Sequence, residues 1–268
     1  MLRTRILTAA VLGSLLLAGL FLLPAAWTVL GFGAVFSIGG WEWAGFGALR
    51  GAARIGYAAI IAVLEVLAWR WTREPAHLAW LMGAACVWWV IALAWLTLAP
   101  ARHRPWLALA CGLPVLVPAF VALAGMQVTS SAFVRGPELV LSLVFLVIAA
   151  DVGAYFVGRQ FGRHKLAPRV SPGKTWEGAA GGLVLVALVA WAWAAYAGIA
   201  AGPFVAVAIV VGISSIIGDL TESMFKRASG LKDSGVLLPG HGGLLDRIDS
   251  VTAAAPLYVL MLGSGVIA

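Results

Sequence analysis

Charged side chains that could take part in catalysis or binding gather in residues 218–250, between two segments that are almost entirely apolar. This stretch holds five carboxylates, four basic residues and one histidine. From Asp219 through Glu222 and Ser223 to Lys226, polar residues recur at the spacing i, i+3, i+4, i+7. A helix over this segment would place them on one face, where it leaves the membrane. The residue types and their spacing therefore predict a charged helix face at a lipid boundary.

A second pair of carboxylates follows, Asp246 and Asp249, again three residues apart. Two helices that present carboxylates at the same depth can bind a hard divalent cation, because such cations prefer oxygen ligands. We predict Asp219, Asp246 and Asp249 as metal ligands. The alternative is that the acids only form ion pairs with neighbouring basic residues, which are Lys226, Arg227, Lys232 and Arg247. Charge is expensive at a membrane boundary, and this favours the functional interpretation.

A glycine cluster, "PGHGG" at residues 239–243, connects the two groups of acids. Glycine permits positive φ and a close approach of a ligand to the backbone, and successive N–H groups at a helix start can bind an anion. Beside lysines and a predicted divalent cation, Gly242 and Gly243 indicate phosphate binding, with His241 as an anion donor or a base. A plain turn with a structural histidine is the open alternative.

An earlier polar loop, residues 158–178, supplies a second set of phosphate-binding candidates. Its basic residues are Arg159, Arg163, Lys165, Arg169 and Lys174. In "SPGKTWEG", Ser171, Lys174 and Thr175 offer hydroxyl and ammonium groups to phosphate oxygens just before the next apolar segment. The alternative is an ordinary cytoplasmic loop rich in basic residues. Asp151 precedes this loop inside an apolar segment, where an acid needs a cation or a partner.

The elements that must position these residues are membrane helices. Hydrophobic residues make up 62% of the chain, mean hydropathy is +1.00 and only 11% of residues are charged, which excludes an ordinary soluble domain. The apolar runs are continuous and reach the length of about 20 residues that crosses a bilayer, whereas a barrel would alternate with period two. We predict an all-α polytopic membrane protein with about nine spans, near residues 6–23, 27–47, 56–69, 78–98, 106–125, 138–157, 179–200, 203–218 and 251–267. The first of these resembles a secretory signal, but its length and the spans that follow favour an uncleaved helix.

Orientation follows from the basic residues between the spans. With the N-terminus inside, most of them face the cytoplasm, as the positive-inside rule requires. Two spans separate the two polar loops, so both loops share one compartment, and their charge makes it the cytoplasm. Flanking residues of this kind explain the net charge of +7, so we predict membrane lipid and no nucleic acid as a partner.

The two halves of the chain differ in their polar residues. Every Lys and every Asp lies after residue 150. We therefore predict a transmembrane scaffold in residues 1–137 and the catalytic region in residues 138–268. Tryptophans near predicted span ends are typical of interfacial belts, and they are Trp41, Trp43, Trp69, Trp71 and Trp106.

Carboxylates suited to Mg²⁺, lysines and a glycine turn at a lipid boundary together indicate phosphoryl or nucleotidyl transfer on a lipid. The run "SMFKRASGLKDSGVLLPGHGGLLDRID", residues 223–249, resembles the signature of the phosphatidate cytidylyltransferases, also called CDP-diacylglycerol synthases. The segments "ADVGAYFVGRQFGRHKLAPRVSPGKTWEG" and "GDLTESMFKR" are similar to the bacterial members, and "WEWAG" near Trp41 is similar to a common early segment. The resemblance is tight after residue 145 and looser before it.

The resemblance implies that CTP reacts with phosphatidic acid to give CDP-diacylglycerol and pyrophosphate, with Mg²⁺ required and a second cation left open. Asp219 and Asp246 then resemble the metal ligands and form the catalytic set with Lys226. The residues predicted to bind substrate are Lys165, Ser171, Lys174, Thr175, Ser223, Arg227, Lys232, His241, Gly242, Gly243 and Arg247. The resemblance also implies a bacterial cytoplasmic (inner) membrane with the active-site loops on the cytoplasmic side. A homodimer is left open.

Three other functions are alternatives: a CDP-alcohol phosphotransferase, a CTP-dependent lipid kinase and a transporter. The D-G-x-x-A-R start of the phosphotransferase motif is absent from the sequence. A transporter that uses Asp151 and Asp219 as intramembrane ion ligands would often show broken helices in matching halves. Here the polar residues gather in one half instead.

Overall fold

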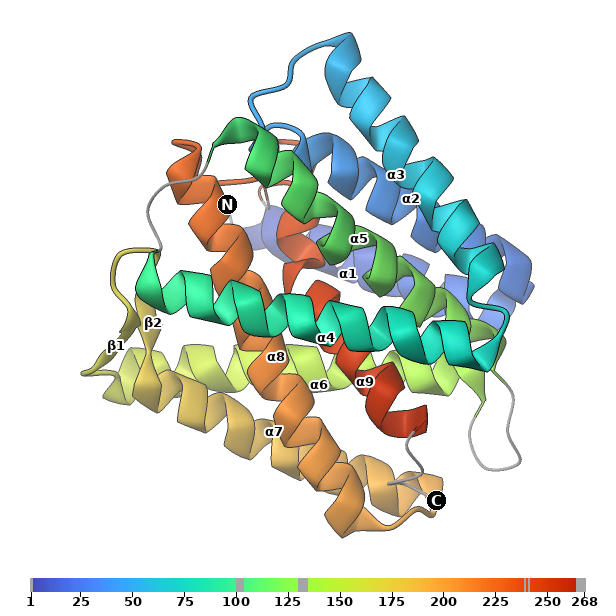
Figure 1. Cartoon of the computed structure of the whole chain (residues 1–268). Helices are drawn as coiled ribbons and strands as arrows, with labels where there is room; N and C mark the ends of the chain where they lie inside the picture. Colours follow the sequence, from blue (N-terminus) through green and yellow to red (C-terminus); the bar gives the residue numbers. More distant parts are fainter. Residues whose placement is uncertain (1, 100–103, 130–134, 239, 241, 264–268) are drawn as a thin grey trace.

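The computed structural model describes residues 2–99, 104–129, 135–238, 240 and 242–263, and most of these are helical (Figure 1). The described residues form nine α-helices: α1 (Leu2–Leu22), α2 (Ala25–Trp43), α3 (Ala52–Trp71), α4 (Pro75–Leu98), α5 (Pro105–Val128), α6 (Gly136–Phe161), α7 (Trp176–Ala197), α8 (Ala201–Ala228) and α9 (Asp249–Gly263). A 3₁₀ turn (Leu245–Arg247) precedes α9, and a two-stranded sheet precedes α7.

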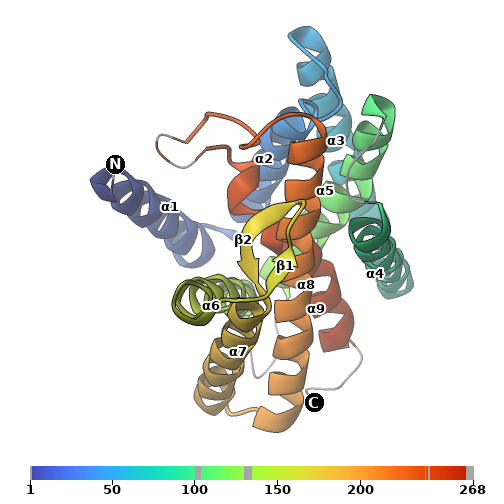
Figure 2. The same cartoon turned by 90° about the vertical axis from the view of Figure 1, so that its left-hand side faces the viewer.

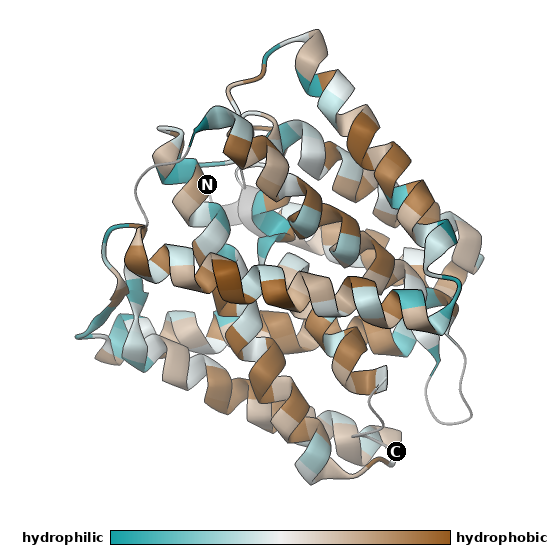
Figure 3. Ribbon diagram, viewed as in Figure 1, coloured by the Kyte–Doolittle hydropathy of each residue, from teal (hydrophilic) through white to brown (hydrophobic). Residues whose placement is uncertain are grey.

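The predicted membrane spans correspond to these helices. Each of the nine predicted spans overlaps one helix, in the same order along the chain. Within the described residues, six helices (α3 to α8) are long and apolar enough to cross a membrane. Figure 3 shows hydrophobic residues along the middle of the helices and hydrophilic residues gathered toward the loops and helix ends. The chain is therefore an all-α, multi-pass membrane protein, as its composition predicts.

The loop between α6 and α7 contains a β-hairpin that the sequence reasoning did not predict. Strand β1 (Lys165–Ala167) pairs antiparallel with β2 (Ser171–Thr175). This pairing gives hydrogen bonds to backbone N–H and C=O groups that would lack partners in an irregular loop beside membrane helices. Thr175 ends the hairpin and caps α7, because its hydroxyl accepts a hydrogen bond from Gly178 N at 3.1 Å. The β1–β2 pairing and the Thr175 cap together hold β2 at the start of α7.

Helix α5 forms the centre of the bundle and is buried along most of its length. Two side chains from neighbouring helices donate to its first turns: Trp43 Nε1 to Ala108 O and Tyr57 Oη to Leu109 O, both at 2.7 Å. Gly112 leaves room for them, since an added Cβ there would collide with both rings. Trp43 is only 1% exposed, so its predicted place in an interfacial belt is wrong and it belongs to the core.

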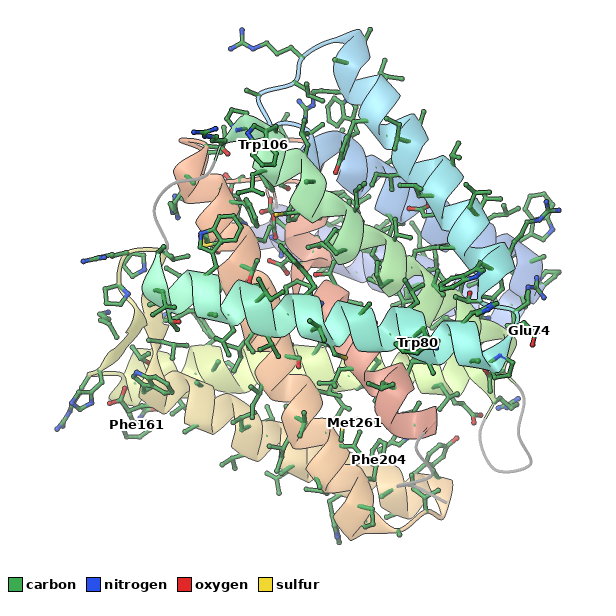
Figure 4. The ribbon with its side chains drawn as sticks, in the orientation of Figure 1. Glu74, Trp80, Trp106, Phe161, Phe204 and Met261 are labelled. Carbon is green, nitrogen blue, oxygen red and sulfur yellow. The ribbon has the colours of Figure 1, made fainter. Side chains whose placement is uncertain are left out.

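The outer surface of the bundle is apolar. Trp80 on α4 is 75% exposed, and Trp106 and Phe161 are each 60% exposed. In Figure 4, Trp106 begins α5 and Phe161 ends α6, both beside the polar loops. Exposed hydrocarbon and ring surface on this scale suits helices that face lipid.

Helices α6 and α7 pack with their backbones in close approach. An added Cβ at Gly182 would lie 2.5 Å from Ala150 O, and one at Gly153 would lie 2.7 Å from Gly181 O. Small residues permit this kind of helix contact inside a membrane, where close van der Waals packing drives association. The pair supports β2, which is joined directly to α7.

Replacing Gly182 with alanine should destabilise the protein by about 1–3 kcal/mol, because the added methyl forces α6 and α7 apart. Thermal unfolding of the purified protein in detergent measures this change. The matched control is Gly56→Ala on the exposed face of α3, where nothing lies within 4 Å of an added Cβ. Alanine favours a helix, so the control should be neutral or slightly stabilising. An unchanged unfolding temperature for Gly182→Ala would contradict the close packing of α6 on α7.

Candidate active site

The two polar loops meet at the same end of the helix bundle. The hairpin lies beside the C-terminal part of α8 in Figures 1 and 2. Lys174 Nζ on β2 pairs with Asp219 Oδ2 on α8 at 2.6 Å, and Arg227 Nε on α8 donates to Val170 O at 3.4 Å. The predicted convergence of the two loops is therefore confirmed.

A buried ammonium group lies at the centre of the site. Lys226 on α8 is 7% exposed, and its Nζ lies 2.6 Å from Asp246 Oδ1 and 3.4 Å from Glu222 Oε1. Glu222 and Lys226 are four residues apart, so the helix itself brings them together, as their spacing predicts. Asp249 lies beside Glu222 and adds a further carboxyl group. The cluster therefore holds more acidic than basic side chains in a buried place.

Asp246 has hydrogen bonds to both of its carboxylate oxygens. Oδ1 accepts from Lys226, and Oδ2 accepts from Ser234 N at 3.0 Å, Ser234 Oγ at 3.0 Å and Gly243 N at 2.8 Å. Burial alone would raise the pKa of the Asp246 carboxyl, but the hydrogen bond and charge of Lys226 and the two N–H groups lower it below its ordinary value. Asp246 is thus held as a carboxylate in one orientation.

A cavity of about 510 Å³ lies beside this cluster, between α6, β2, α7 and α8. Its polar lining consists of Asp151, Tyr155, Arg159, Ser171, Lys174, Thr175 and Asp219. Asp219 also accepts a hydrogen bond from Ser223 Oγ at 3.3 Å. A cavity of this volume is typical of sites for small ligands. The intramembrane acid Asp151 thus faces the same cavity as the Lys174–Asp219 pair.

The carboxylates predicted to bind Mg²⁺ do not form a finished metal site. Asp219 pairs with Lys174, and Asp246 is occupied by Lys226, Ser234 and Gly243, as described above. Among the residues that the structure describes, no group of three or more His, Cys, Asp or Glu side chains is placed to hold a metal ion. Both carboxyl oxygens of Glu222, by contrast, are buried without a hydrogen-bond partner. The oxygen donors suit Mg²⁺ in type, and Asp219, Asp246 and Asp249 remain predicted ligands.

Glu42 is a residue of this region to which the sequence reasoning assigned no role. It lies on α2, within the predicted scaffold, and is fully buried. Its carboxylate accepts hydrogen bonds from Ser234, Leu244 and Leu245 in the segment between α8 and α9. The available signal was the segment "WEWAG", which places an acid between two tryptophans at the end of an apolar run.

Three successive backbone N–H groups at the end of the glycine cluster and just after it donate to carboxylates of the protein. Gly243 N donates to Asp246, whereas Leu244 N and Leu245 N donate to Glu42. Of the residues predicted to form the nest, Gly243 therefore already donates its N–H to a carboxylate of the protein, and phosphate binding by Gly242 and Gly243 stays a prediction. Gly242 does adopt a positive φ of +82°, which favours glycine, as predicted for the turn. His241 lies outside the described residues.

The remaining basic candidates surround this centre. Lys165 on β1, Arg227 at the end of α8, Lys232 in the following segment and Arg247 in the 3₁₀ turn are all exposed. Ser171 is half-buried in β2, whereas Thr175 is buried and serves as the cap of α7. Their contacts with a substrate remain predictions.

Known proteins match this chain over nearly its full length. The model of the family described as "Cytidylyltransferase family" matches residues 3–264. This chain belongs to that family. A phosphatidate cytidylyltransferase of Pseudomonas aeruginosa is 44% identical over 98% of this chain and 97% of its own length. One of Haemophilus influenzae is 38% identical over 96% of this chain and 97% of its own length.

A third relative matches the chain only in part. A phosphatidate cytidylyltransferase of Brucella suis is 44% identical over 51% of this chain and 53% of its own length. The match to the cytidylyltransferase family begins at residue 3, so it includes α2 and Glu42 together with both polar loops. The family resemblance inferred from the motifs is confirmed.

Proposed function

We propose that this chain is a phosphatidate cytidylyltransferase, which joins CTP and phosphatidic acid to give CDP-diacylglycerol and pyrophosphate. The proposal is carried by one observation, the meeting of acids and lysines from both polar loops at one end of an apolar helix bundle. It is supported by the relatives that resemble the chain over nearly its full length. A lipid substrate suits this position, because its acyl chains can stay in the bilayer while its phosphate reaches the loops.

The proposed step is an in-line displacement at phosphorus. An oxygen of the phosphatidate phosphate attacks the α-phosphorus of CTP, and a new P–O bond forms. The bond from the α-phosphorus to the bridging oxygen breaks, and pyrophosphate leaves with the electron pair. A phosphate monoester is already nucleophilic near neutral pH, so the protein needs no strong general base. Its contribution is positioning and neutralisation of charge.

Two lysines have different parts in this proposal. Lys174 lines the cavity and its side chain is 27% exposed, so its ammonium can exchange Asp219 for a phosphate oxygen. Lys226 is buried between Glu222 and Asp246 and keeps Asp246 in place. Asp219, Lys226 and Asp246 are the proposed catalytic set, and the exposed basic residues around them are proposed phosphate contacts.

The requirement for Mg²⁺ and the orientation in the membrane are also parts of the proposal. A divalent cation would neutralise phosphate charge, and the carboxylates of the site are ligands of the type that it prefers. We propose the bacterial cytoplasmic membrane as the location, with both polar loops in the cytoplasm. This is supported by the bacterial relatives and by the basic residues of these loops.

Product analysis tests the proposed function. Purified protein in mixed micelles, given CTP, phosphatidic acid and Mg²⁺, should release pyrophosphate and form CDP-diacylglycerol, and should do so much faster with CTP than with ATP. Release of CDP would identify a lipid kinase instead, and release of CMP from CDP-diacylglycerol and an alcohol would identify a phosphotransferase. Chelation of divalent cations should abolish the reaction. An unchanged rate would contradict the Mg²⁺ requirement but not the proposed reaction.

A further inference from the structure

A carboxylate from the first half of the chain holds the segment between α8 and α9. Glu42 is 0% exposed, and all three of its hydrogen-bond donors come from this segment. Glu42 Oε2 accepts from Ser234 Oγ at 3.1 Å and from Leu245 N at 2.7 Å, whereas Oε1 accepts from Leu244 N at 3.1 Å. Hydrogen bonds to a charged acceptor are stronger than those between neutral groups. Glu42 therefore connects two parts of the segment, Ser234 and the pair Leu244 and Leu245, to α2.

Asp246, which lies within this segment, also accepts hydrogen bonds from it. Ser234 Oγ lies between the two carboxylates, 3.1 Å from Glu42 Oε2 and 3.0 Å from Asp246 Oδ2, and its one proton is shared between them. Gly243 N donates to Asp246, and the next two backbone N–H groups donate to Glu42. The position of Asp246 against Lys226 thus depends on a turn that Glu42 fastens to the bundle.

Two glycines give Glu42 access to the backbone of the segment. An added Cβ at Gly235 would collide with Glu42 Oε1, and one at Gly243 would lie 2.6 Å from Glu42 Oε2 and collide with Ser234 Oγ. The glycine at position 243 therefore makes room for a carboxylate of the protein itself.

We propose that Glu42 is a positioning residue that holds the segment between α8 and α9 so that Asp246 meets Lys226. The inference rests on the proposed function, because it assigns Glu42 a part in the same reaction. The charge matters as well as the shape, since the carboxylate accepts from three groups of the described residues. Glutamine at this position would turn an NH₂ group toward one of these donors and leave a buried N–H or hydroxyl without an acceptor.

Glu65 provides a matched control for a buried acid in the same half of the chain. It lies on α3, is 2% exposed and accepts a hydrogen bond from Ser37 Oγ at 3.2 Å. The cavity beside Glu65 is lined by residues of α2, α3 and α5 and by Arg73 between α3 and α4, none of which belongs to the segment between α8 and α9. A general effect of replacing a buried acid in this half of the chain would appear in Glu65→Gln, whereas an effect on the segment would not.

Kinetics of pyrophosphate release provide the first test. Glu42→Gln should lower kcat/KM by on the order of tenfold to a hundredfold, because Asp246 loses its alignment with Lys226. Glu42→Asp keeps the charge and should recover part of this loss, and Glu65→Gln should remain close to the wild type. Normal kinetics for Glu42→Gln, or an equal loss for Glu65→Gln, would overturn the inference.

Hydrogen exchange provides a second readout that needs no substrate. The amides of Leu244 and Leu245 should exchange about ten to a hundred times faster in Glu42→Gln, because they lose hydrogen bonds to a charged acceptor. The hairpin at residues 165–175 serves as the internal reference and should exchange as in the wild type. Unchanged exchange at the two leucines, or faster exchange in the hairpin as well, would show that Glu42 does not act through this segment.

The two readouts also separate failure of this inference from failure of the proposed function. If the wild type releases no pyrophosphate from CTP and phosphatidate, the proposed function fails, whatever the exchange rates show. If the wild type is active and Glu42→Gln is equally active, only the part assigned to Glu42 fails.

Discussion

Replacing Lys226 with methionine should abolish pyrophosphate release and lower the free energy of unfolding by about 3–5 kcal/mol. Methionine has a similar length but no charge, so Asp246 would lose the cation bonded to its Oδ1 and Glu222 would lose the ammonium that lies 3.4 Å from its Oε1. Asp246 would keep the donors of Ser234 and Gly243, whereas the oxygens of Glu222 have no hydrogen-bond partner among the described residues. Pyrophosphate release and thermal unfolding in detergent measure the two effects separately.

A double variant distinguishes loss of the fold from loss of the chemistry. Lys226→Met combined with Glu222→Gln removes the ammonium and one of the two acids that lie beside it. The double variant should regain most of the lost stability, since Asp246 retains the donors of Ser234 and Gly243. Its turnover should stay at background. A double variant that regains activity together with stability would show that Lys226 is only a structural counter-ion.

Asp219→Asn and Asp246→Asn should each lower turnover by on the order of a hundredfold or more, because both remove charge from the proposed site. Their effects on stability should differ. Asp246 accepts from Lys226, Ser234 and Gly243, so the NH₂ group of an asparagine would face one of these donors. The free energy of unfolding should fall by about 1.5–3 kcal/mol. The pair of Asp219 with Lys174 is partly exposed, and its loss should hardly change the unfolding temperature.

The matched control for both variants is Glu74→Gln, which removes an exposed acid at the start of α4, far from the hairpin in Figure 4. It should leave both turnover and unfolding unchanged. Near-normal turnover of Asp219→Asn and Asp246→Asn would contradict the proposed catalytic set. A loss of stability in Asp219→Asn as large as in Asp246→Asn would contradict the different partners described for the two acids.

The parts of the structure that follow from local periodicity could be predicted from the sequence. Continuous apolar runs predict helices because the backbone must satisfy its own hydrogen bonds in lipid. The spacing from Asp219 to Lys226 correctly predicted a shared helix face, since it depends only on the geometry of one helix. Counting spans between the polar loops likewise predicted that they lie at the same end.

Features that depend on contacts between distant residues could not be predicted in this way. Glu42 and Leu245 are 203 positions apart, and nothing in the sequence near Glu42 indicates its partner. The glycine at position 243 suggested a phosphate nest, whereas the space beside it is filled by a carboxylate from α2. Trp43 lies near a helix end, where tryptophan often faces the interface, but its ring nitrogen donates to Ala108 in the core. In each case tertiary packing decided between two locally equivalent interpretations.

The bond between Glu42 and the last part of the chain has a consequence for biosynthesis. Proteins are made from the N-terminus, so α2 enters the membrane long before Leu244 and Leu245 leave the ribosome. Until then the carboxyl group of Glu42 lacks its three donors. The hydrogen bonds from Ser234, Leu244 and Leu245 to Glu42 can form only after nearly the whole polypeptide has been translated. This part of the structure therefore assembles late in maturation.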